Sequence, residues 1–427
     1  MSAVVCFVLN DRDSLQAGGL GHITLRRRVG LFPIDKFRAH RVEQAMEKYD
    51  LDLLVASLPE HILYLLNFTI LGATYQTKTQ NYAICSRNPA QPHRLVISPS
   101  DAPTAMEFSQ EVELVCHGGF HFEFHQPLDD FALHLQNQIE QRYSSPADAL
   151  IEAIRRCGAN PRRIGIDELR TPVTTWNKVA AAFPNTELVP ALTIFEEIRC
   201  VKHPDEIDLI ERATHIAEDS LLSTLNHAKY GDSEYDLGMD YRVEVAKRNA
   251  NGYFCTCTID QRTAFSDTRH RADNKLADGS IIRFDFGALY QFYRSDLART
   301  IVVGKANPQV EFSYQAIHSG LEEAIKQIRP GVTAGEVFDT AVKTVRKWGI
   351  PHYKRHHCGH GIGLQIYDPP SVSSQSETVL EPGMVLCIET PYYEIGKWGI
   401  QIEDTVAVTE DGWRRLSHTG NQLIKIF

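Results

Sequence analysis

The apolar residues of the first half of the chain fall into short runs that alternate between helical and strand-like periods. Helices are expected at 33–50, 61–67, 127–141, 147–157 and 172–183, and strands at 51–57, 81–86, 93–97, 111–116 and 163–167. Such alternation predicts an α/β domain with a largely parallel sheet. Residues 1–30 have weak periodicity and are expected to form an N-terminal arm.

The second half has longer helical stripes and longer strands. A long helix is expected from Pro204, because proline suits the first helical position and the acids Asp205 and Glu206 suit the first turn. The domains are therefore expected at 31–197 and 198–427. Further helices are expected at 233–250, 308–328 and 334–348, and strands within 253–303 and at 385–391, 399–409 and 413–416. This order predicts an α+β domain with helices packed on an antiparallel sheet.

Composition narrows the choice of partners and compartment. Of the 427 residues, 43% are hydrophobic and 23% are charged. A chain of this length is longer than a domain with a single hydrophobic core usually is, so two domains are expected. A net charge of −10 offers no basic surface for nucleic acid. No apolar run approaches the roughly 20 residues of a membrane span, and the first residues lack a signal-peptide pattern. The nine cysteines are scattered, as is typical of reduced thiols, so a cytoplasmic protein is expected.

Four acidic residues interrupt apolar runs in the second half. Asp285 lies in Arg-Phe-Asp-Phe-Gly, Asp296 in Ser-Asp-Leu-Ala, Glu389 in Ile-Glu-Thr-Pro and Glu403 in Ile-Glu-Asp. The two aspartates fall on one expected hairpin and the two glutamates on another, so each pair can face across its strands. Because unpaired charges are costly to bury, these acids predict a cluster whose four negative charges two divalent cations neutralise.

One histidine is the best partner for these acids. His360 lies between two glycines, where the backbone can approach a bound ion closely. Alone, such a histidine is more often a loop residue, but beside four carboxylates it becomes the leading imidazole candidate. Oxygen-rich sites with one imidazole suit manganese, cobalt, iron and zinc, and the ligand types do not choose among them.

With these motifs the chain resembles the pita-bread metallohydrolases, which include Xaa-Pro aminopeptidase, prolidase, creatinase and methionine aminopeptidase. The resemblance is strong over residues 200–427 and weaker over 30–195, which are similar to the creatinase-type N-terminal domain. It implies a curved antiparallel catalytic sheet covered by helices. It also implies a homodimer in which the partner subunit helps to close the active site.

The resemblance also implies roles for single residues. Two metal ions, manganese in the first place and cobalt, zinc or iron as alternatives, would be held by Asp285, Asp296, His360, Glu389 and Glu403. A hydroxide bridging the two ions would attack the substrate's carbonyl carbon, and Glu389 would take and relay the proton. His356 matches one substrate-side histidine of the proline-peptide members. His270 matches the other, although its spacing to Asp285 is slightly shorter than usual.

Two positions depart from the pattern of the proline-specific members. Those members carry a histidine seven residues after the ligand histidine, where this chain has Tyr367, and an arginine two residues before the last glutamate, where it has Gln401. A phenol can donate a hydrogen bond to an oxyanion, but it does not become a cation near neutral pH. Glutamine cannot supply the charge of an arginine. Proline specificity is therefore less strongly implied than metal binding.

Three functions remain open at this point. The first is an Xaa-Pro-type aminopeptidase or dipeptidase that acts on short peptides. The second is a creatinase-like hydrolase of a small non-peptide C–N bond, in a guanidino compound, a cyclic amidine or a modified amino acid, which Tyr367 and Gln401 favour. The third is a non-catalytic binding protein on the same fold, against which the five ligand-type residues argue.

Overall fold

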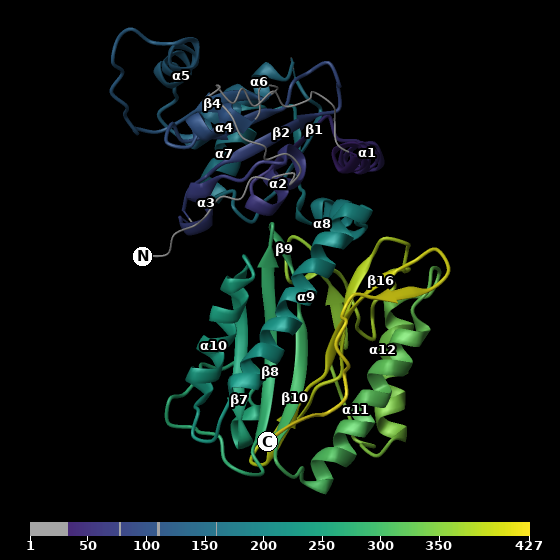
Figure 1. Cartoon of the computed structure of the whole chain (residues 1–427). Helices are drawn as coiled ribbons and strands as arrows, with labels where there is room; N and C mark the ends of the chain where they lie inside the picture. The colour runs from purple at the N-terminus through teal and green to yellow at the C-terminus, as the bar shows by residue number, and fades with distance from the viewer. Residues whose placement is uncertain (1–32, 77, 109–111, 159) are drawn as a thin grey trace, which may run out of the picture.

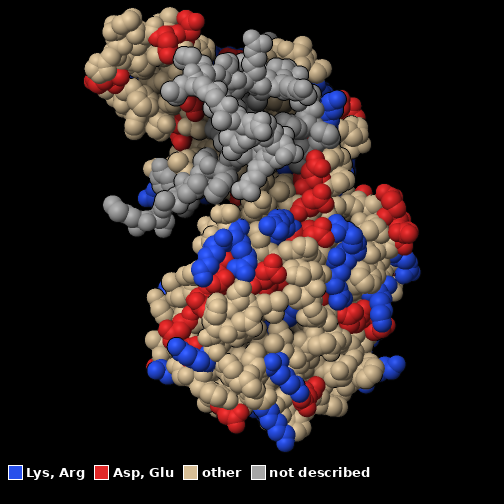
Figure 2. Space-filling view, in the orientation of Figure 1, with Lys and Arg blue, Asp and Glu red and all other residues tan. Residues whose placement is uncertain are grey.

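The computed structural model describes residues 33–427, apart from 77, 109–111 and 159. The arm expected at residues 1–30 lies outside the described residues. Figure 1 shows two units, a smaller one built from the first half of the chain and a larger one built from the second half. On the face drawn in Figure 2, basic and acidic side chains are intermixed over the larger unit rather than gathered by sign. Within the described residues, none of the helices combines the length and the hydropathy that a bilayer span requires.

The smaller unit contains a six-stranded sheet in the order β4-β3-β2-β1-β5-β6. Its strands are β1 (Leu53–Ala56), β2 (Tyr82–Ser86), β3 (Arg94–Ile97), β4 (Glu113–Cys116), β5 (Arg163–Ile166) and β6 (Glu187–Pro190). Strand β2 is antiparallel to both of its neighbours, while the other pairs are parallel. The sheet is therefore mixed where a largely parallel one was expected. The short connection between β2 and β3 explains part of this, since parallel strands need a longer crossover.

Helices cover this sheet, and most of them begin where the sequence predicts. They are α1 (Pro33–Lys48), α2 (Pro59–Leu66), α3 (Leu71–Tyr75), α4 (Ala102–Phe108), α5 (Asp130–Glu140), α6 (Pro146–Arg156), α7 (Val173–Ala182) and α8 (Leu192–Cys200). The side chains of Asp129 and Ser145 cap α5 and α6 by accepting backbone N–H groups of the first turn. Helices α3, α4 and α8 were not predicted. The domain boundary expected between residues 197 and 198 falls inside α8, and it stays a prediction.

A buried histidine–carboxylate pair ties the smaller unit together. Asp167, just after β5, accepts backbone N–H groups of Ser57 and Leu58 at 3.2 and 2.8 Å. It also accepts Nδ1–H of His61 at 2.7 Å, and neither side chain of the pair is exposed. The His61 ring stacks on Phe195 of α8, with 4.2 Å between ring centroids. The pair thus joins β1, α2, β5 and α8.

The buried His61–Asp167 pair should make the stability of the fold sensitive to acid. Burial lowers the pKa of His61; burial alone would raise the pKa of Asp167, but its hydrogen bonds with His61 and the two amides lower it. At both groups the unfolded chain therefore binds protons at a higher pH than the folded chain does. The free energy of unfolding should fall as the pH drops below 6.5, the ordinary pKa of histidine, and fall again below 3.8, the ordinary pKa of aspartate. We expect the melting-temperature difference between wild type and His61→Asn to narrow from pH 8 to pH 5. A difference that is independent of pH would contradict this.

The larger unit begins with α9 and α10, and its remaining helices also lie where they were predicted. Its helices are α9 (Pro204–His227), α10 (Glu234–Lys247), α11 (Pro308–Gln327) and α12 (Ala334–Lys347). Three of them start with a capping box, in which the N-cap side chain and the acid three residues later each satisfy the other's backbone N–H. Arg38 of α1 donates to Glu206 of α9 and to the hydroxyl of Tyr293, so a buried contact joins the two units.

The larger unit's sheet has the central order β12-β11-β13-β16-β10-β8-β7, and the pairs along this path are antiparallel. Its strands are β7 (Asn251–Ile259), β8 (Ile281–Tyr290), β9 (Tyr293–Arg294), β10 (Leu297–Val303), β11 (Gly359–Gly361), β12 (Asp368–Ser371), β13 (Val385–Glu389), β16 (Glu403–Val408), β17 (Trp413–Arg415) and β18 (Ile424–Ile426). Strands β14 (Tyr392–Glu394) and β15 (Trp398–Ile400) form a separate hairpin. Helices pack on this curved sheet (Figure 1). The predicted fold class, an α/β unit followed by a helix-covered antiparallel sheet, is confirmed.

Alternation along β8 decides which side chains face the site. Ile282, Phe284 and Phe286 pack into the core that α9 and α10 share with the sheet. Because successive side chains point to opposite faces, Arg283 and Asp285 lie on the other face. The strand therefore buries a charged face and an apolar face at the same time, and the charged face requires compensation.

Candidate metal centre

One row of residues crosses four neighbouring strands of the larger sheet. Asp285 of β8 pairs with Ala298 of β10, Ala298 pairs with Glu403 of β16, and Glu403 pairs with Glu389 of β13. Directly paired residues on adjacent strands have Cβ atoms about 5 Å apart. Asp296 lies two residues before Ala298, so it is diagonal to Asp285 rather than opposite it. The row brings three of the predicted acids, Asp285, Glu403 and Glu389, to one face of the sheet, and the fourth, Asp296, lies beside Glu403.

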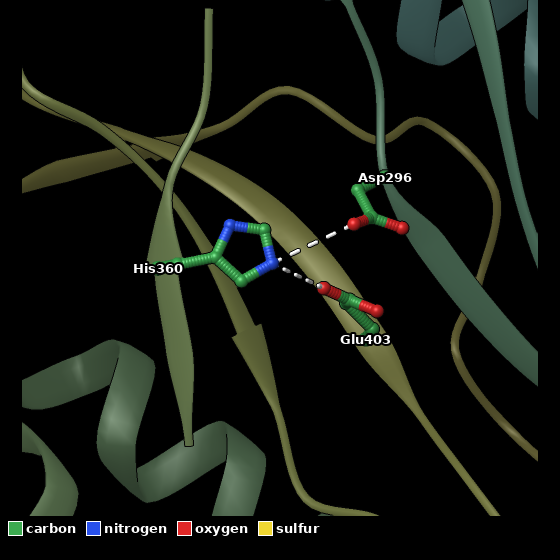
Figure 3. Close-up of side chains that lie close together, drawn as sticks. All are labelled: Asp296, His360 and Glu403. Atoms are coloured by element: carbon green, nitrogen blue, oxygen red, sulfur yellow. Dashed lines mark ion pairs between the residues drawn. The ribbon is translucent and has the colours of Figure 1, made fainter. Parts of the chain in front are cut away.

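His360 approaches these acids from β11, where it pairs with Cys387 of β13. Its Nε2 lies 3.5 Å from Oδ2 of Asp296 and 3.9 Å from Oε1 of Glu403 (Figure 3). Its Nδ1 donates a hydrogen bond to the carbonyl of Gly361 at 2.9 Å. That bond fixes the neutral tautomer whose Nε2 carries the lone pair, and Nε2 is the atom that faces both carboxylates.

The ligand atoms of Asp296, His360 and Glu403 lie within 4.8 Å of one another, and all three residues are buried. The side chains of Asp296 and Glu403 are only 6% and 3% exposed. Oδ1 of Asp296 and Oε1 of Glu403 are buried and have no hydrogen-bond partner among the described residues. Buried oxygens of this kind cost free energy unless something compensates them. The donor set and its orphaned oxygens therefore fit a divalent cation.

The electrostatics of the cluster point the same way. Burial, followed by the charge of Asp296, raises the pKa of Asp285 to about 8. Burial and the neighbouring carboxylates raise the pKa of Glu403 well above its ordinary value. Burial would also raise the pKa of Glu389, but its hydrogen bond with His357 and other nearby positive charges outweigh this and lower it. Without cations, the cluster retains protons that a bound metal would displace.

The loop before β11 brings two adjacent histidines to different surroundings. His357 Nδ1 lies 3.0 Å from Oε1 of Glu389. His356 is exposed, and its ring meets that of His357 edge-on at 4.1 Å. Tyr367 is 61% exposed, yet its ring lies 4.1 Å from the ring of His360. Both His356 and Tyr367 therefore lie beside the carboxylate cluster, at the side that is open to solvent.

His270 lies apart from the cluster in its contacts among the described residues. Its Nε2 accepts the backbone N–H of Cys257 at 3.1 Å. Its ring packs against Gly238 of α10, where a Cβ atom would overlap the imidazole. The buried carboxylate of Glu234 holds the loop that carries His270 by accepting the backbone N–H of Arg271 at 2.9 Å. The substrate-side role predicted for His270 stays a prediction.

Sequence reasoning missed three cationic or ionisable neighbours of the carboxylates. They are Arg283, which lies 3.3 Å from Asp285, and Arg355 and His357, which lie 3.8 and 3.0 Å from Glu389. For Arg283 a signal was present, because it is a charged residue two positions before Asp285 in an apolar strand. The other two lie in a loop without periodicity, where no pattern indicates which side chain turns inward.

Comparison with known proteins agrees with this fold. Residues 38–201 match the model of the Creatinase/Prolidase N-terminal domain, and residues 208–410 match that of metallopeptidase family M24. The uncharacterised peptidase YqhT of Bacillus subtilis is 30% identical over 264 residues, which are 62% of this chain and 75% of YqhT. The Xaa-Pro dipeptidase of Pyrococcus furiosus is 31% identical over 233 residues, which are 54% of this chain and 67% of that protein.

A solved structure extends the agreement to the whole fold. The Xaa-Pro dipeptidase from Bacillus anthracis superposes with a TM-score of 0.77 at 22% identity, covering 92% of this chain and all of the other. The resemblance predicted from the carboxylate and histidine motifs is confirmed. The chain belongs to metallopeptidase family M24, with a creatinase/prolidase-type N-terminal domain, and is a metallohydrolase.

Proposed function

We propose that this chain is a dinuclear-metal hydrolase of C–N bonds that acts, in the first place, as an Xaa-Pro-type dipeptidase or aminopeptidase on short peptides. The observation that carries the proposal is the row of Asp285, Glu403 and Glu389 across four strands, with Asp296 and His360 beside it. The relatives named as Xaa-Pro dipeptidases support a peptide substrate.

The two cations would be held by Asp285, Asp296, His360, Glu389 and Glu403. Bound there, they would supply a water activated near neutral pH and would polarise the carbonyl of the substrate. We propose manganese as the first candidate, because four carboxylates and one imidazole form an oxygen-rich site, and cobalt, zinc or iron as alternatives.

The chain's own residues would carry the proton and orient the substrate. Glu389 would accept the proton of the attacking water and deliver it to the leaving nitrogen. The ring of His357, whose Nδ1 lies 3.0 Å from Oε1 of Glu389, would hold this carboxylate in one orientation. His356 would bind the substrate from the open side, and the phenol of Tyr367 would donate a hydrogen bond to the developing oxyanion. His270 is a further substrate-side candidate if its loop moves away from Cys257.

The two adjacent histidines can be told apart by substitution. His357→Ala is expected to weaken manganese binding by about 10- to 100-fold, because it removes the imidazole that lies 3.0 Å from Glu389 and orients its carboxylate. His356→Ala is the matched control, since its exposed ring contacts His357 and forms no ion pair with a carboxylate of the described residues. We expect it to retain manganese affinity and to change KM. Calorimetric titration with Mn²⁺ compares the two, and equal losses in both variants would contradict the assignment.

A substrate screen tests the proposed function itself. Protein stripped of metal and reloaded with manganese or cobalt is offered Xaa-Pro dipeptides and short Xaa-Pro peptides, with Asp296→Ala as the blank. Turnover of the proline peptides by the wild type alone supports the proposal. Metal binding without turnover of any proline peptide would overturn the peptidase assignment.

A second function is favoured by one pair of positions. Tyr367 lies against His360 and Gln401 contacts Glu389, where proline-specific members of the resembling family carry a histidine and an arginine. These changes support a creatinase-like hydrolase of a small guanidino compound, cyclic amidine or modified amino acid. Turnover of such a compound, with none of a proline dipeptide, would decide for it. Absence of bound metal and of affinity for added metal would instead indicate a non-catalytic binding protein.

Assembly and location belong to the same proposal. We propose a homodimer whose partner subunit helps to close the site, and a monomer by light scattering at micromolar concentration would contradict it. We also propose a cytoplasmic location, which the free thiols of the cysteines in the described part of the chain support.

A further inference from the structure

Arg283 is a fully buried arginine on the face of β8 that carries Asp285. Its Nη1 donates to Oε1 of Gln401 at 2.7 Å and lies 3.3 Å from Oδ2 of Asp285. Its Nε donates to the carbonyl of Thr263 at 3.0 Å, and its Nη2 donates to the carbonyls of residues 265 and 266. One guanidinium thus connects the carboxylate cluster to the loop after β7.

Gln401 extends this contact to a second carboxylate. Its Oε1 accepts from Arg283 and from the hydroxyl of Tyr393, the latter at 3.1 Å, while its Nε2 lies 3.4 Å from Oε2 of Glu389. The amide accepts from a cation at one end and donates to a carboxylate at the other, so the two hydrogen bonds strengthen each other. Arg283 therefore acts on Asp285 directly and on Glu389 through one amide.

Burying the guanidinium of Arg283 costs free energy unless its charge is compensated. A buried guanidinium is tolerated when its N–H groups are satisfied and an anion lies close by. Among the described residues, Asp285 is the carboxylate within ion-pair distance of Arg283. A packing role alone would be filled more cheaply by an apolar side chain, as at the neighbouring apolar positions of β8.

We infer that Arg283 is a positioning residue of the metal centre. It supplies from β8 the positive charge that Gln401 does not provide, and it orients Asp285 directly and Glu389 through the Gln401 amide. The inference rests on the metal centre proposed above. In this chain the guanidinium thus comes from β8, two residues before Asp285, and not from position 401, two residues before Glu403.

Manganese binding tests the inference without relying on turnover. Calorimetric titration of metal-stripped protein compares the wild type with Arg283→Met, Arg283→Lys, the double variant Arg283→Met/Gln401→Arg, and Arg38→Met, with circular dichroism as the check on folding. We expect Arg283→Met to bind manganese about 10- to 100-fold more weakly. The double variant should recover most of that loss, because its new guanidinium returns the charge from position 401, whose side chain lies beside Glu389. Arg38→Met is the matched control, since it removes a buried arginine paired with Glu206, and it should keep the wild-type affinity.

Arg283→Lys keeps the inference testable if Arg283→Met does not fold. An ammonium group keeps the charge but cannot reach Asp285, Gln401 and the loop carbonyls together, so an intermediate affinity is expected. Wild-type affinity in Arg283→Met or in Arg283→Lys would overturn the inference, as would a double variant no tighter than Arg283→Met. A wild type that binds no manganese would overturn the proposed function, and this inference with it.

Discussion

Glu403→Gln is expected to abolish manganese binding and, at the same time, to raise the melting temperature of the metal-free protein. The carboxylate of Glu403 is buried, its Oε1 has no hydrogen-bond partner among the described residues, and other acids surround it. Glutamine has nearly the same shape and no charge, and its NH₂ group can donate to a neighbouring carboxylate. Removing the unsatisfied group should stabilise the metal-free protein by about 1–3 kcal/mol.

A second buried glutamate provides the matched control. Glu218 of α9 is equally buried, but its oxygens lie 3.2 Å from Arg299 and accept the backbone N–H of His418 at 2.8 Å. Glu218→Gln is therefore expected to lower the melting temperature and to leave manganese affinity intact. Scanning calorimetry in chelator and titration with Mn²⁺ measure both quantities. A Glu403→Gln protein that binds manganese like the wild type, or that melts below it, would contradict the prediction.

The sequence was informative about the carboxylate cluster because alternation along strands is a strong constraint. Glu389 and Glu403 were expected to face each other, and they are direct partners. Asp285 and Asp296 are displaced by one diagonal step, because β9 and the turn at residues 291–292 separate Asp296 from the position opposite Asp285. Alternation identifies the face of a side chain, but register depends on the turn that joins the strands.

The remaining parts of the site depend on contacts between distant segments, which no local pattern records. Gln401 accepts a hydrogen bond from Arg283, which lies 118 residues away in the sequence. From the sequence around position 401 alone, glutamine indicates only that an arginine's charge is missing. His356 and His357 differ by one position in a loop, where neither period applies, so only the resemblance could choose between them. Similarly, the mixed sheet of the smaller unit follows from how β2 inserts between its neighbours.

The largest loss of stability is expected from a substitution on the opposite face of β16. Glu403 and Asp404 are adjacent, so they point to opposite sides of the sheet. On the helix side, Arg299 is buried, and its Nη2 lies 2.8 Å from Asp404 and 3.2 Å from Glu218. Arg299→Met leaves both acids buried without this cation, which should cost about 3–5 kcal/mol, because breaking a buried pair strands its charges. Thermal unfolding should report a fall on the order of 10 °C.

The same reasoning predicts which changes rescue that variant. In the triple variant Arg299→Met/Asp404→Asn/Glu218→Gln the stranded charges are gone, so most of the lost stability should return, as buried ion pairs can often be replaced by neutral groups. Arg415 also lies 3.5 Å from Asp404 but is partly exposed, and Arg415→Met should cost about 1 kcal/mol or less. If the triple variant melted no higher than Arg299→Met, stranded charge would not be the cause. Acids on one face of β16 are thus compensated by a guanidinium. On the other face, the described residues place no arginine or lysine within ion-pair distance of Glu403 or Asp296, which supports the inorganic cation that we propose there.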